Sequence, residues 1–256
     1  MRCFFAKETF SLQSDHPIRR FLAARLSPEG QFGLHLTVGL VLIVLAGIAF
    51  GEIAEDVVEG DTITVIDVQL AHWFRERATE DFTRAMLFIT HWNGIVGTSI
   101  MTALLAGWFA WRKAYYWLIV VLATVPGGML LNVVLKHIFR RQRPSLDDPL
   151  LTLSTYSFPS GHTVAATLFY GVLACYLVRR NPHWPRRVLI VGAACAMVML
   201  VALSRMYLGV HYLSDVMAAS MEGAVWLAVC VTAVSTLHRR RLAHGRPSWS
   251  ERRDPI

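Results

Sequence analysis

The sequence predicts an all-α fold, a bundle of six transmembrane helices that form a single domain over residues 1–256. The composition is strongly apolar, with 54% hydrophobic residues and a mean hydropathy of +0.43. The apolar stretches run for 16 to 22 residues with almost no charge, about what a helix needs to cross a hydrocarbon core ~30 Å thick. We expect the spans at residues 34–51, 90–111, 115–136, 163–178, 188–204 and 216–237.

The second expected span is the least regular. Residues 82–111 are too long for one helix perpendicular to the membrane and too short for two spans, and they include His91, Asn93 and Gly94. We therefore expect a break, a tilt or a preceding surface helix in this region. The preceding residues 62–80 alternate apolar and charged side chains, which is typical of an amphipathic segment at the interface and equally of an ordered loop.

Positive charge is distributed unevenly between the two sides of the expected membrane. Seventeen Lys and Arg residues fall in the tails 1–32 and 238–256 and in the two turns on their side, whereas seven fall on the other side. Cytoplasmic loops of membrane proteins carry the excess of Lys and Arg, so both termini are expected in the cytoplasm. The first loop on the other side is acidic from Glu52 to Asp61, which agrees with an outside location.

The overall charge has two possible explanations. A net charge of +7 and an isoelectric point near 9.6 are compatible with binding to nucleic acid. The basic residues cluster beside the apolar runs, so we assign them to the membrane surface and expect no nucleic-acid partner.

Residues 1–33 contain no early apolar core followed by a cleavage pattern, so the first apolar run is expected to remain as a span. The compact chain and short loops favour a bacterial inner membrane.

Three short motifs contain most of the residues with catalytic potential. They are K-x6-R-P starting at Lys136, P-S-G-H starting at Pro159, and S-R-x5-H-x3-D starting at Ser204. They follow the third expected span, precede the fourth and connect the fifth to the sixth, so the topology alone places them on one membrane face. The first motif holds more cations than a translocated loop normally carries, and we expect them to serve a ligand. These cations are Lys136, Arg140, Arg141 and Arg143.

The residue types in these motifs suit a phosphate group. Ser160 is expected to cap the fourth span and Gly161 lets a ligand approach the backbone, while a helix N-terminus favours an anion. Lys136 and Arg143 lie seven residues apart and would share a face if the helix continued, but Pro144 disfavours helix before it. Each motif alone also has an ordinary explanation, such as a snorkelling cation or a capped helix.

The motifs also supply two imidazoles and a carboxylate. His211 and Asp215 are four residues apart, so in a helical turn the carboxylate lies beside the ring. There it fixes the tautomer and leaves the other ring nitrogen free to attack. His162 falls in the first turn of the fourth span, beside the expected anion. The residue types in the motifs leave open which histidine attacks. The neighbouring carboxylate favours His211.

The order, spacing and common face of the three motifs resemble the type 2 phosphatidic acid phosphatase (PAP2) superfamily, which also contains the vanadium haloperoxidases and bacterial acid phosphatases. The resemblance implies the helical core of that superfamily and a two-step reaction. His211 would form a phosphohistidine, Asp215 would orient it, and His162 would protonate the leaving alkoxide and then activate water. The resemblance assigns the phosphate oxygens to Lys136, Arg143, Ser160, Gly161 and Arg205.

The resemblance implies neither a metal nor another cofactor, because the protein cations take the place of a metal. Asp147 and Asp148 could instead bind a divalent ion, although solvated loop carboxylates explain them better. Glu222 and Asn132 lie within expected spans, where polar groups are functional candidates. For Glu222, which is seven residues from Asp215, structural pairing is favoured over a catalytic role.

The resemblance and the apolar spans together imply a membrane lipid phosphatase that acts at the extracytoplasmic face. Undecaprenyl pyrophosphate, phosphatidylglycerophosphate and phosphatidic acid are the expected substrates, so the expected partners are a lipid phosphate and the bilayer. A lipid A phosphatase and a lipid phosphotransferase are alternatives with related chemistry. An anion or lipid transporter is the alternative from another class, but the spans show no evident inverted repeat and no paired broken helices.

Overall fold

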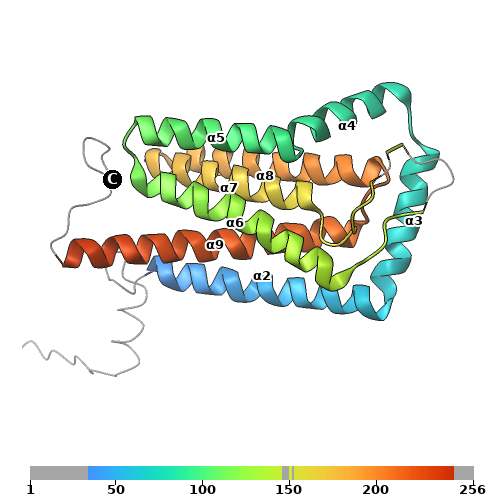
Figure 1. The fold of residues 1–256 in the computed structure, drawn as a ribbon, viewed down its shortest axis with the longest axis horizontal. Coiled ribbons are helices and arrows are strands. Elements are labelled where there is room, and N and C mark those ends of the chain that lie inside the picture. The colour runs from blue at the N-terminus through green and yellow to red at the C-terminus, as the bar shows by residue number, and fades with distance from the viewer. Residues whose placement is uncertain (1–33, 146–149, 152, 245–256) are drawn as a thin grey trace, which may run out of the picture.

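The computed structural model describes residues 34–145, 150–151 and 153–244, and within these segments it contains helices and loops but no strand (Figure 1). The predicted all-α class is confirmed. The predicted N-terminal tail 1–32 lies outside the described residues. The helices are α2 (Leu34–Glu59), α3 (Thr62–Glu76), α4 (Glu80–Trp92), α5 (Ile95–Trp111), α6 (Tyr115–Phe139), α7 (Gly161–Arg180), α8 (Trp184–Tyr207) and α9 (Leu213–Ala243).

Six candidate membrane spans make up the bundle. The helices α2, α6, α7, α8 and α9 are each long and apolar enough to cross a bilayer. The helices α4 and α5 pass the same test together, with a bend of 47° between them. With this bent pair counted as one span, the bundle agrees with the prediction. Helix α9 continues to Ala243, so the predicted C-terminal tail 238–256 begins within a helix.

The bend between α4 and α5 lies at Asn93 and Gly94, where the sequence predicts a break. Asn93 Nδ2 donates to a backbone carbonyl of α4 at 2.9 Å, and its Oδ1 accepts from the Tyr170 hydroxyl of α7 at 3.0 Å. A Cβ at Gly97 would lie 2.1 Å from the Trp92 carbonyl oxygen, so α5 can begin this close to α4 only with glycine there. The bend is therefore held both by its own packing and by α7.

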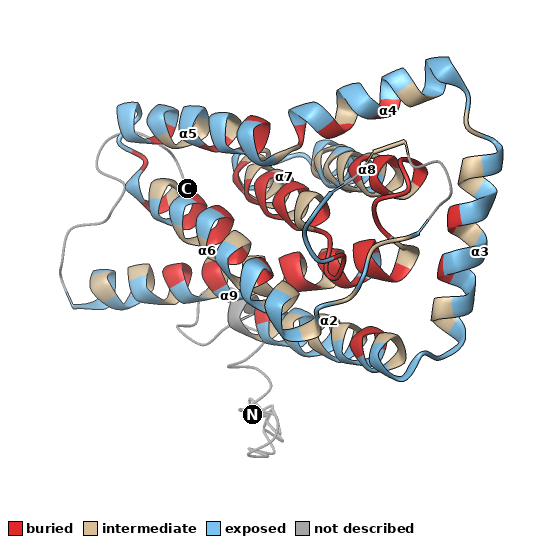
Figure 2. Cartoon of the chain, turned by 45° about the vertical axis from the view of Figure 1, so that its right-hand side comes forward, coloured by how far each residue is buried: buried red, intermediate tan, exposed pale blue. Residues whose placement is uncertain are grey.

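Helix α7 lies at the centre of the bundle, with α5, α6, α8 and α9 around it (Figure 2). Its residues Val164, Leu168 and Val172 recur at helical spacing and have no exposed surface. An added Cβ at Gly128 of α6 would lie 2.4 Å from a Leu168 methyl carbon and 2.8 Å from the Trp226 ring of α9. The small residue thus allows α6 to pack closely against both neighbours, as is common in membrane bundles.

The outward faces of the spans are apolar. Leu45 of α2, Leu104 of α5, Leu130 of α6 and Leu189 of α8 each expose more than half of their surface. Continuous apolar surface of this extent is unfavourable in water and is expected where a protein faces lipid. The exterior of the bundle therefore agrees with the membrane environment that the composition predicts.

The two ends of the bundle differ (Figure 1). Helix α3, predicted as either an amphipathic segment or a loop, is a helix that crosses one end, beside the loops that precede α7 and α9. Helix α2 begins and α9 ends at the opposite end, where the α5–α6 and α7–α8 turns also lie. The basic turns Arg112–Lys113 and 179–187 are thus separated from the predicted motifs by the length of the bundle.

Candidate active site

Segments that are far apart in the sequence meet at the end of the bundle that α3 crosses. The Ser160 amide donates to the Asp215 carbonyl at 3.1 Å, which joins the start of α7 to the start of α9. Arg143 Nη1 lies 3.2 Å from His211 Nε2, which joins the loop after α6 to the turn before α9. The three motifs form one cluster, as the predicted topology requires.

The end of α6 separates the cations of the first motif. Helix α6 ends at Phe139, and Arg140 follows in the left-handed region with φ of 49°. Lys136 and Arg143 therefore do not share a helix face, because Arg143 lies in the extended loop that follows. Arg140 is exposed and donates to a backbone carbonyl of α6 at 2.9 Å. This contact helps to close the helix, and the expectation that Arg140 serves a ligand stays a prediction.

Lys136 and Arg143 hold the loops that enclose the cluster. Lys136 Nζ donates to the Tyr156 carbonyl at 2.7 Å. Arg143 donates through Nε to the Thr155 carbonyl at 2.7 Å and through Nη1 to the Val210 carbonyl at 2.6 Å. The two cations thus fix the loop before α7 and the turn before α9 relative to α6.

The N-terminus of α7 lies close to Lys136 of α6 and has free amides that can contact an anion. Ser160 is its N-cap residue, as predicted, but the hydroxyl makes no capping bond and accepts from the Thr163 hydroxyl at 3.1 Å. A Cβ at Gly161 would lie 3.2 Å from Asn132 Oδ1 and 3.8 Å from Lys136 Cε, so glycine keeps this helix end close to the lysine. The first amides of a helix have no intrahelical partner and favour an anion.

His162 occupies the first turn of α7, beside the bend between α4 and α5. A Cβ at Gly94 would lie 3.4 Å from His162 Nε2, so the bend passes directly beside the ring. The ring is within electrostatic range of Lys136, Arg143 and Arg205. The structure therefore brings the second histidine to the predicted cations.

Arg205 is a buried cation with only 1% of its surface exposed. Its Nη1 donates to the Thr90 hydroxyl of α4, whereas Nε and Nη2 have no hydrogen-bond partner among the described residues. Charged donors are costly to bury without an acceptor. A planar guanidinium can offer two such donors to the oxygens of one phosphate. Arg205 therefore has the geometry of an anion-binding group.

The His211 ring lies between a carboxylate and a cation. Its Nδ1 is 3.3 Å from Asp215 Oδ2, so Nδ1 donates there, and Nε2, which then carries the lone pair, lies 3.2 Å from Arg143 Nη1. Asp215 Oδ2 also accepts from the Tyr212 amide at 2.9 Å and from the Ser157 hydroxyl. Burial lowers the pKa of His211 to about 3, although Asp215 acts to raise it. The ring is thus neutral at neutral pH, and the Nε2 lone pair can attack.

The motifs do not predict the contacts of three residues in the cluster, which are Arg141, Ser157 and Asp67. Arg141 lies within the first motif, where the sequence predicts a ligand contact, and it pairs with two carboxylates, Asp215 at 2.6 Å and Asp67 at 2.7 Å. Ser157 precedes the second motif and gives no signal of its own. Asp67 gives one, because it lies four residues before Ala71 on the buried face of an amphipathic helix. A carboxylate on such a face needs a partner.

Glu222 and Asn132 form a buried pair beside the cluster. Asn132 Nδ2 donates to Glu222 Oε2 at 3.0 Å and to the Pro159 carbonyl at 3.4 Å, which agrees with structural pairing. Within residues 34–145, 150–151 and 153–244, no group of three or more His, Cys, Asp or Glu side chains is placed to hold a metal ion. The alternative metal ligands Asp147 and Asp148 lie outside this part of the chain.

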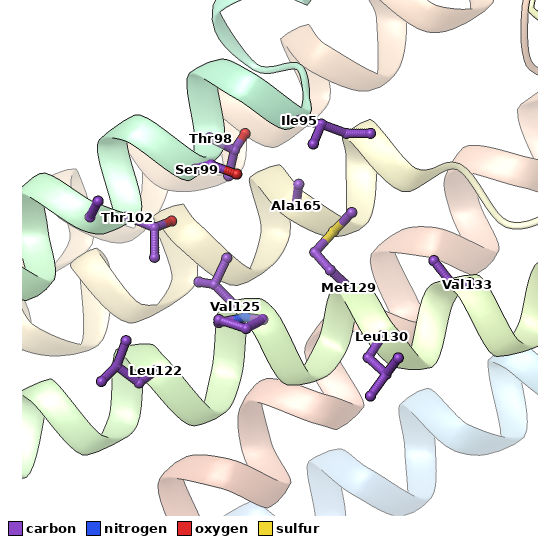
Figure 3. A pocket seen from close by; sticks show the side chains of 12 residues that line it. Ile95, Thr98, Ser99, Thr102, Leu122, Val125, Met129, Leu130, Val133 and Ala165 are labelled. Carbon is purple, nitrogen blue, oxygen red and sulfur yellow. The ribbon is translucent and has the colours of Figure 1, made fainter.

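An apolar groove of about 580 Å³ runs between α5 and α6, with Ala165 of α7 at its base (Figure 3). One end of the groove lies at the cluster. Ile95 directly follows the bend between α4 and α5, Val133 lies one turn before Lys136, and Ala165 lies one turn after His162. Val133 is 47% exposed, so this end of the groove is open to the surroundings of the bundle.

Residues 114–239 match the sequence profile of the PAP2 superfamily. The matched region runs from the start of α6 into α9 and contains all three motifs. This region of the chain belongs to the PAP2 superfamily. The predicted resemblance is therefore confirmed.

The PAP2 region has relatives in Bacillus subtilis. Phosphatidylglycerophosphatase B of strain 168 is 39% identical over 119 residues, which are 46% of this chain and 58% of that protein. The chain thus spans 58% of the length of this curated relative. A solved transmembrane PAP2-type phosphatidylglycerolphosphate phosphatase from Bacillus subtilis superposes with a TM-score of 0.67 at 27% identity, over 77% of this chain and 96% of that one.

A second solved structure shares the PAP2 fold. LpxE of Aquifex aeolicus has a TM-score of 0.52 at 20% identity, over 65% of this chain and 94% of that one. At this identity the similarity supports the fold alone. Both solved structures agree with the helical bundle described above.

Proposed function

We propose that this chain is a metal-independent membrane lipid phosphatase that works through a phosphohistidine at His211. The observation that carries the proposal is the neutral His211 ring, which Asp215 holds among Lys136, Arg143 and Arg205. The cations provide the positive charge that phosphoryl transfer requires, and the histidine provides a nucleophile. Membership of the PAP2 superfamily supports this assignment.

In the first step, His211 Nε2 attacks the phosphorus atom and forms a P–N bond. The bond between phosphorus and the lipid oxygen breaks, and the leaving alkoxide takes a proton from His162, which enters this step as the imidazolium. Asp215 accepts the Nδ1 proton of His211 in a hydrogen bond and stabilises the positive charge that develops on the ring. Arg205 donates its unpaired N–H groups to the equatorial oxygens, together with Lys136.

In the second step, water attacks phosphorus and hydrolyses the intermediate. His162, which lost a proton in the first step, takes one from the water. The P–N bond breaks, inorganic phosphate leaves and His211 regains its Nε2 lone pair. Ser160 and the Gly161 backbone contact the phosphate at the N-terminus of α7 in both steps.

The groove between α5 and α6 supports a lipid as the substrate. It is lined mostly by apolar side chains and extends from the cluster along the membrane-spanning helices. A lipid could thus place its phosphate at His211 while an acyl chain lies against Val133 and Leu130. Because both named Bacillus subtilis relatives are phosphatidylglycerophosphate phosphatases, we favour phosphatidylglycerophosphate over the other substrates.

The orientation follows from the charge distribution. The basic turns lie at the end of the bundle opposite to the cluster, and an excess of Lys and Arg marks the cytoplasmic side. We therefore propose that the protein is integral to the inner membrane of a bacterium, with both termini in the cytoplasm and the active site outside.

The direct test is phosphate release by the purified protein in detergent, from a panel of phosphatidylglycerophosphate, phosphatidic acid, undecaprenyl pyrophosphate and a lipid A phosphate. We expect the fastest release from phosphatidylglycerophosphate, because both named Bacillus subtilis relatives are phosphatidylglycerophosphate phosphatases. Turnover should be the same with a strong chelator present, since protein cations replace a metal.

Two outcomes contradict parts of this proposal. Dependence on added magnesium would favour Asp147 and Asp148 as metal ligands over the metal-free reaction. Binding of the lipids without release of phosphate would favour the transporter or a lipid-binding protein over an enzyme.

Val133→Trp is expected to raise KM for long-chain lipid phosphates several-fold and to leave KM for a short, water-soluble phosphate ester unchanged. The indole would fill the end of the groove where the acyl chain lies, and an unchanged KM for the short ester would show that the phosphate site one turn away is intact. KM measured for esters of increasing chain length checks this. The matched control is Val188→Trp on α8, where a valine of similar exposure faces away from the groove. An equal effect of both substitutions contradicts acyl binding in the groove.

A further inference from the structure

We infer that Asp67 of α3 is a positioning residue for the reaction, which acts through Arg141 on the Asp215 carboxylate and thereby on His211. Asp67 lies outside the three motifs and outside the region that matches the PAP2 superfamily. The inference rests on the proposed function, because it concerns the same site.

Asp67 is completely enclosed and fully bonded. Its side chain has no exposed surface. One oxygen, Oδ1, accepts from the Ser214 amide at 2.9 Å, and the other, Oδ2, accepts from Arg141 Nη2 at 2.7 Å and from the Ser214 hydroxyl. Ser214 belongs to the first turn of α9. A side chain of α3 thus satisfies a free amide at the start of the helix that carries Asp215.

Arg141 connects this carboxylate to the catalytic one. Its Nη1 donates to Asp215 Oδ1 at 2.6 Å and to the Ser214 hydroxyl at 2.7 Å, while Nη2 binds Asp67. Its guanidinium also lies over the Tyr212 ring, 4.3 Å from the centroid. Burial acts to lower the pKa of Arg141, but the contacts with Asp215 and Asp67 raise it overall, so the bridge stays charged. The planar guanidinium fork suits this contact, because its two terminal nitrogens each reach a different carboxylate.

The contact with Arg141 fixes the orientation of the Asp215 carboxylate relative to the His211 ring. Arg141 binds Asp215 Oδ1, whereas His211 Nδ1 binds Oδ2 of the same carboxylate. Any movement of Arg141 that rotates the carboxylate therefore also moves the ring. Asp67 limits such movement, because it fixes the second arm of the guanidinium.

Asp67 also sets the charge that acts on the ring. With Arg141 shared between two carboxylates, the three side chains carry one net negative charge. The ring of His211 becomes positive as the P–N bond forms, and a nearby negative charge stabilises it strongly in a buried site. If Asp67 were neutral, Arg141 would neutralise Asp215 alone, and this stabilisation of the phosphorylated ring would be lost.

The competing explanation is a purely structural role, in which Asp67 only caps α9. The two explanations predict different kinetics. Loss of a cap lowers the thermal stability and the yield of folded protein, but it leaves kcat of the folded fraction intact. Loss of a positioning charge lowers kcat and leaves KM nearly unchanged, because Lys136 and Arg205 still bind the phosphate.

The test is Asp67→Asn, which preserves the shape of the side chain and an acceptor for the Ser214 amide. We expect kcat on the preferred lipid phosphate to fall by roughly 10- to 100-fold, which corresponds to a loss of about 1.4 to 2.7 kcal/mol of transition-state stabilisation. The control is Asp61→Asn at the exposed N-cap of the same helix, which removes the same charge without a contact to Arg141. A kcat for Asp67→Asn equal to that of the control overturns the inference.

A double-mutant cycle tests whether Asp67 acts through Arg141. In an Arg141→Gln background, Asp67→Asn should cause no further loss of kcat, because the bridge is already gone. Losses that multiply in the double variant would show an independent role for Asp67 and overturn the inference.

If Asp67→Asn is not recovered folded, Arg141→Lys tests the link from the other end. Lysine retains the charge but lacks the planar fork that reaches Asp215 and Asp67 with separate nitrogens, so kcat should fall while KM stays close to that of the wild type. Retention of wild-type kcat by Arg141→Lys overturns the inference. Wild-type turnover is measured first, so a failure of the proposed function is seen there, before any variant is compared.

Discussion

Replacing His211 with alanine is expected to abolish the phosphoenzyme and to lower turnover by about 10⁵- to 10⁶-fold, the loss typical of removing a nucleophile. The His211 Nε2 lone pair is the one that Asp215 leaves free for attack. The measurement combines phosphate release with trapping of labelled protein after brief exposure to a radioactive lipid phosphate and a quench in base. Label that persists in His211→Ala would show that another residue is the nucleophile.

The fold should survive this substitution. Asp215 retains Arg141, Ser157 and the Tyr212 amide as partners when the imidazole is removed. His183→Ala is the matched control, because this exposed histidine lies at the start of α8, at the far end of the bundle. The control should keep wild-type turnover, and both variants should unfold at similar temperatures.

His162→Ala is expected to lower turnover of lipid phosphates by about 10²- to 10⁴-fold, the usual contribution of a general acid and base. The two steps should respond differently to the leaving group. With p-nitrophenyl phosphate, the leaving phenolate needs no proton, so phosphorylation of His211 should remain relatively fast. Hydrolysis of the intermediate still lacks its base, and labelled phosphoenzyme should accumulate.

The control for His162→Ala is the ratio of its losses on the two kinds of substrate. Because both substrates share the hydrolysis step, the losses are compared in the rate of phosphoenzyme formation before the steady state. An equal loss in this rate for lipid alkoxides and for p-nitrophenolate would contradict a role as general acid. Such a result would leave His162 as a residue that shapes the site beside Gly94 rather than one that transfers protons.

The spans and the motif positions could be predicted because their signals are local. A run of apolar residues about as long as the bilayer is thick identifies a span wherever it occurs. The bend at Asn93 and Gly94 also has a local cause, because these residues interrupt an otherwise continuous helix. The convergence of the three motifs then follows from the alternation of spans across the membrane.

The partners of individual charges could not be predicted, because they depend on distant segments. Arg141 and Arg143 are two residues apart and look equivalent in the sequence, yet one bridges Asp67 and Asp215 and the other contacts His211. The helix ends in a left-handed turn at Arg140, so both side chains lie in the loop that follows and not on a helix face. Neither the turn nor the position of α3 follows from hydrophobic periodicity.

The contact between α3 and the start of α9 determines whether α6 to α9 can be used without the rest of the chain. A shortened chain that starts at residue 114 would keep every predicted catalytic and phosphate-binding residue. It would nevertheless leave Arg141 with one carboxylate and the Ser214 amide without its acceptor. Anyone who grafts α6 to α9 onto another membrane protein would therefore need to transfer α3 as well, or to supply an acid in the place of Asp67.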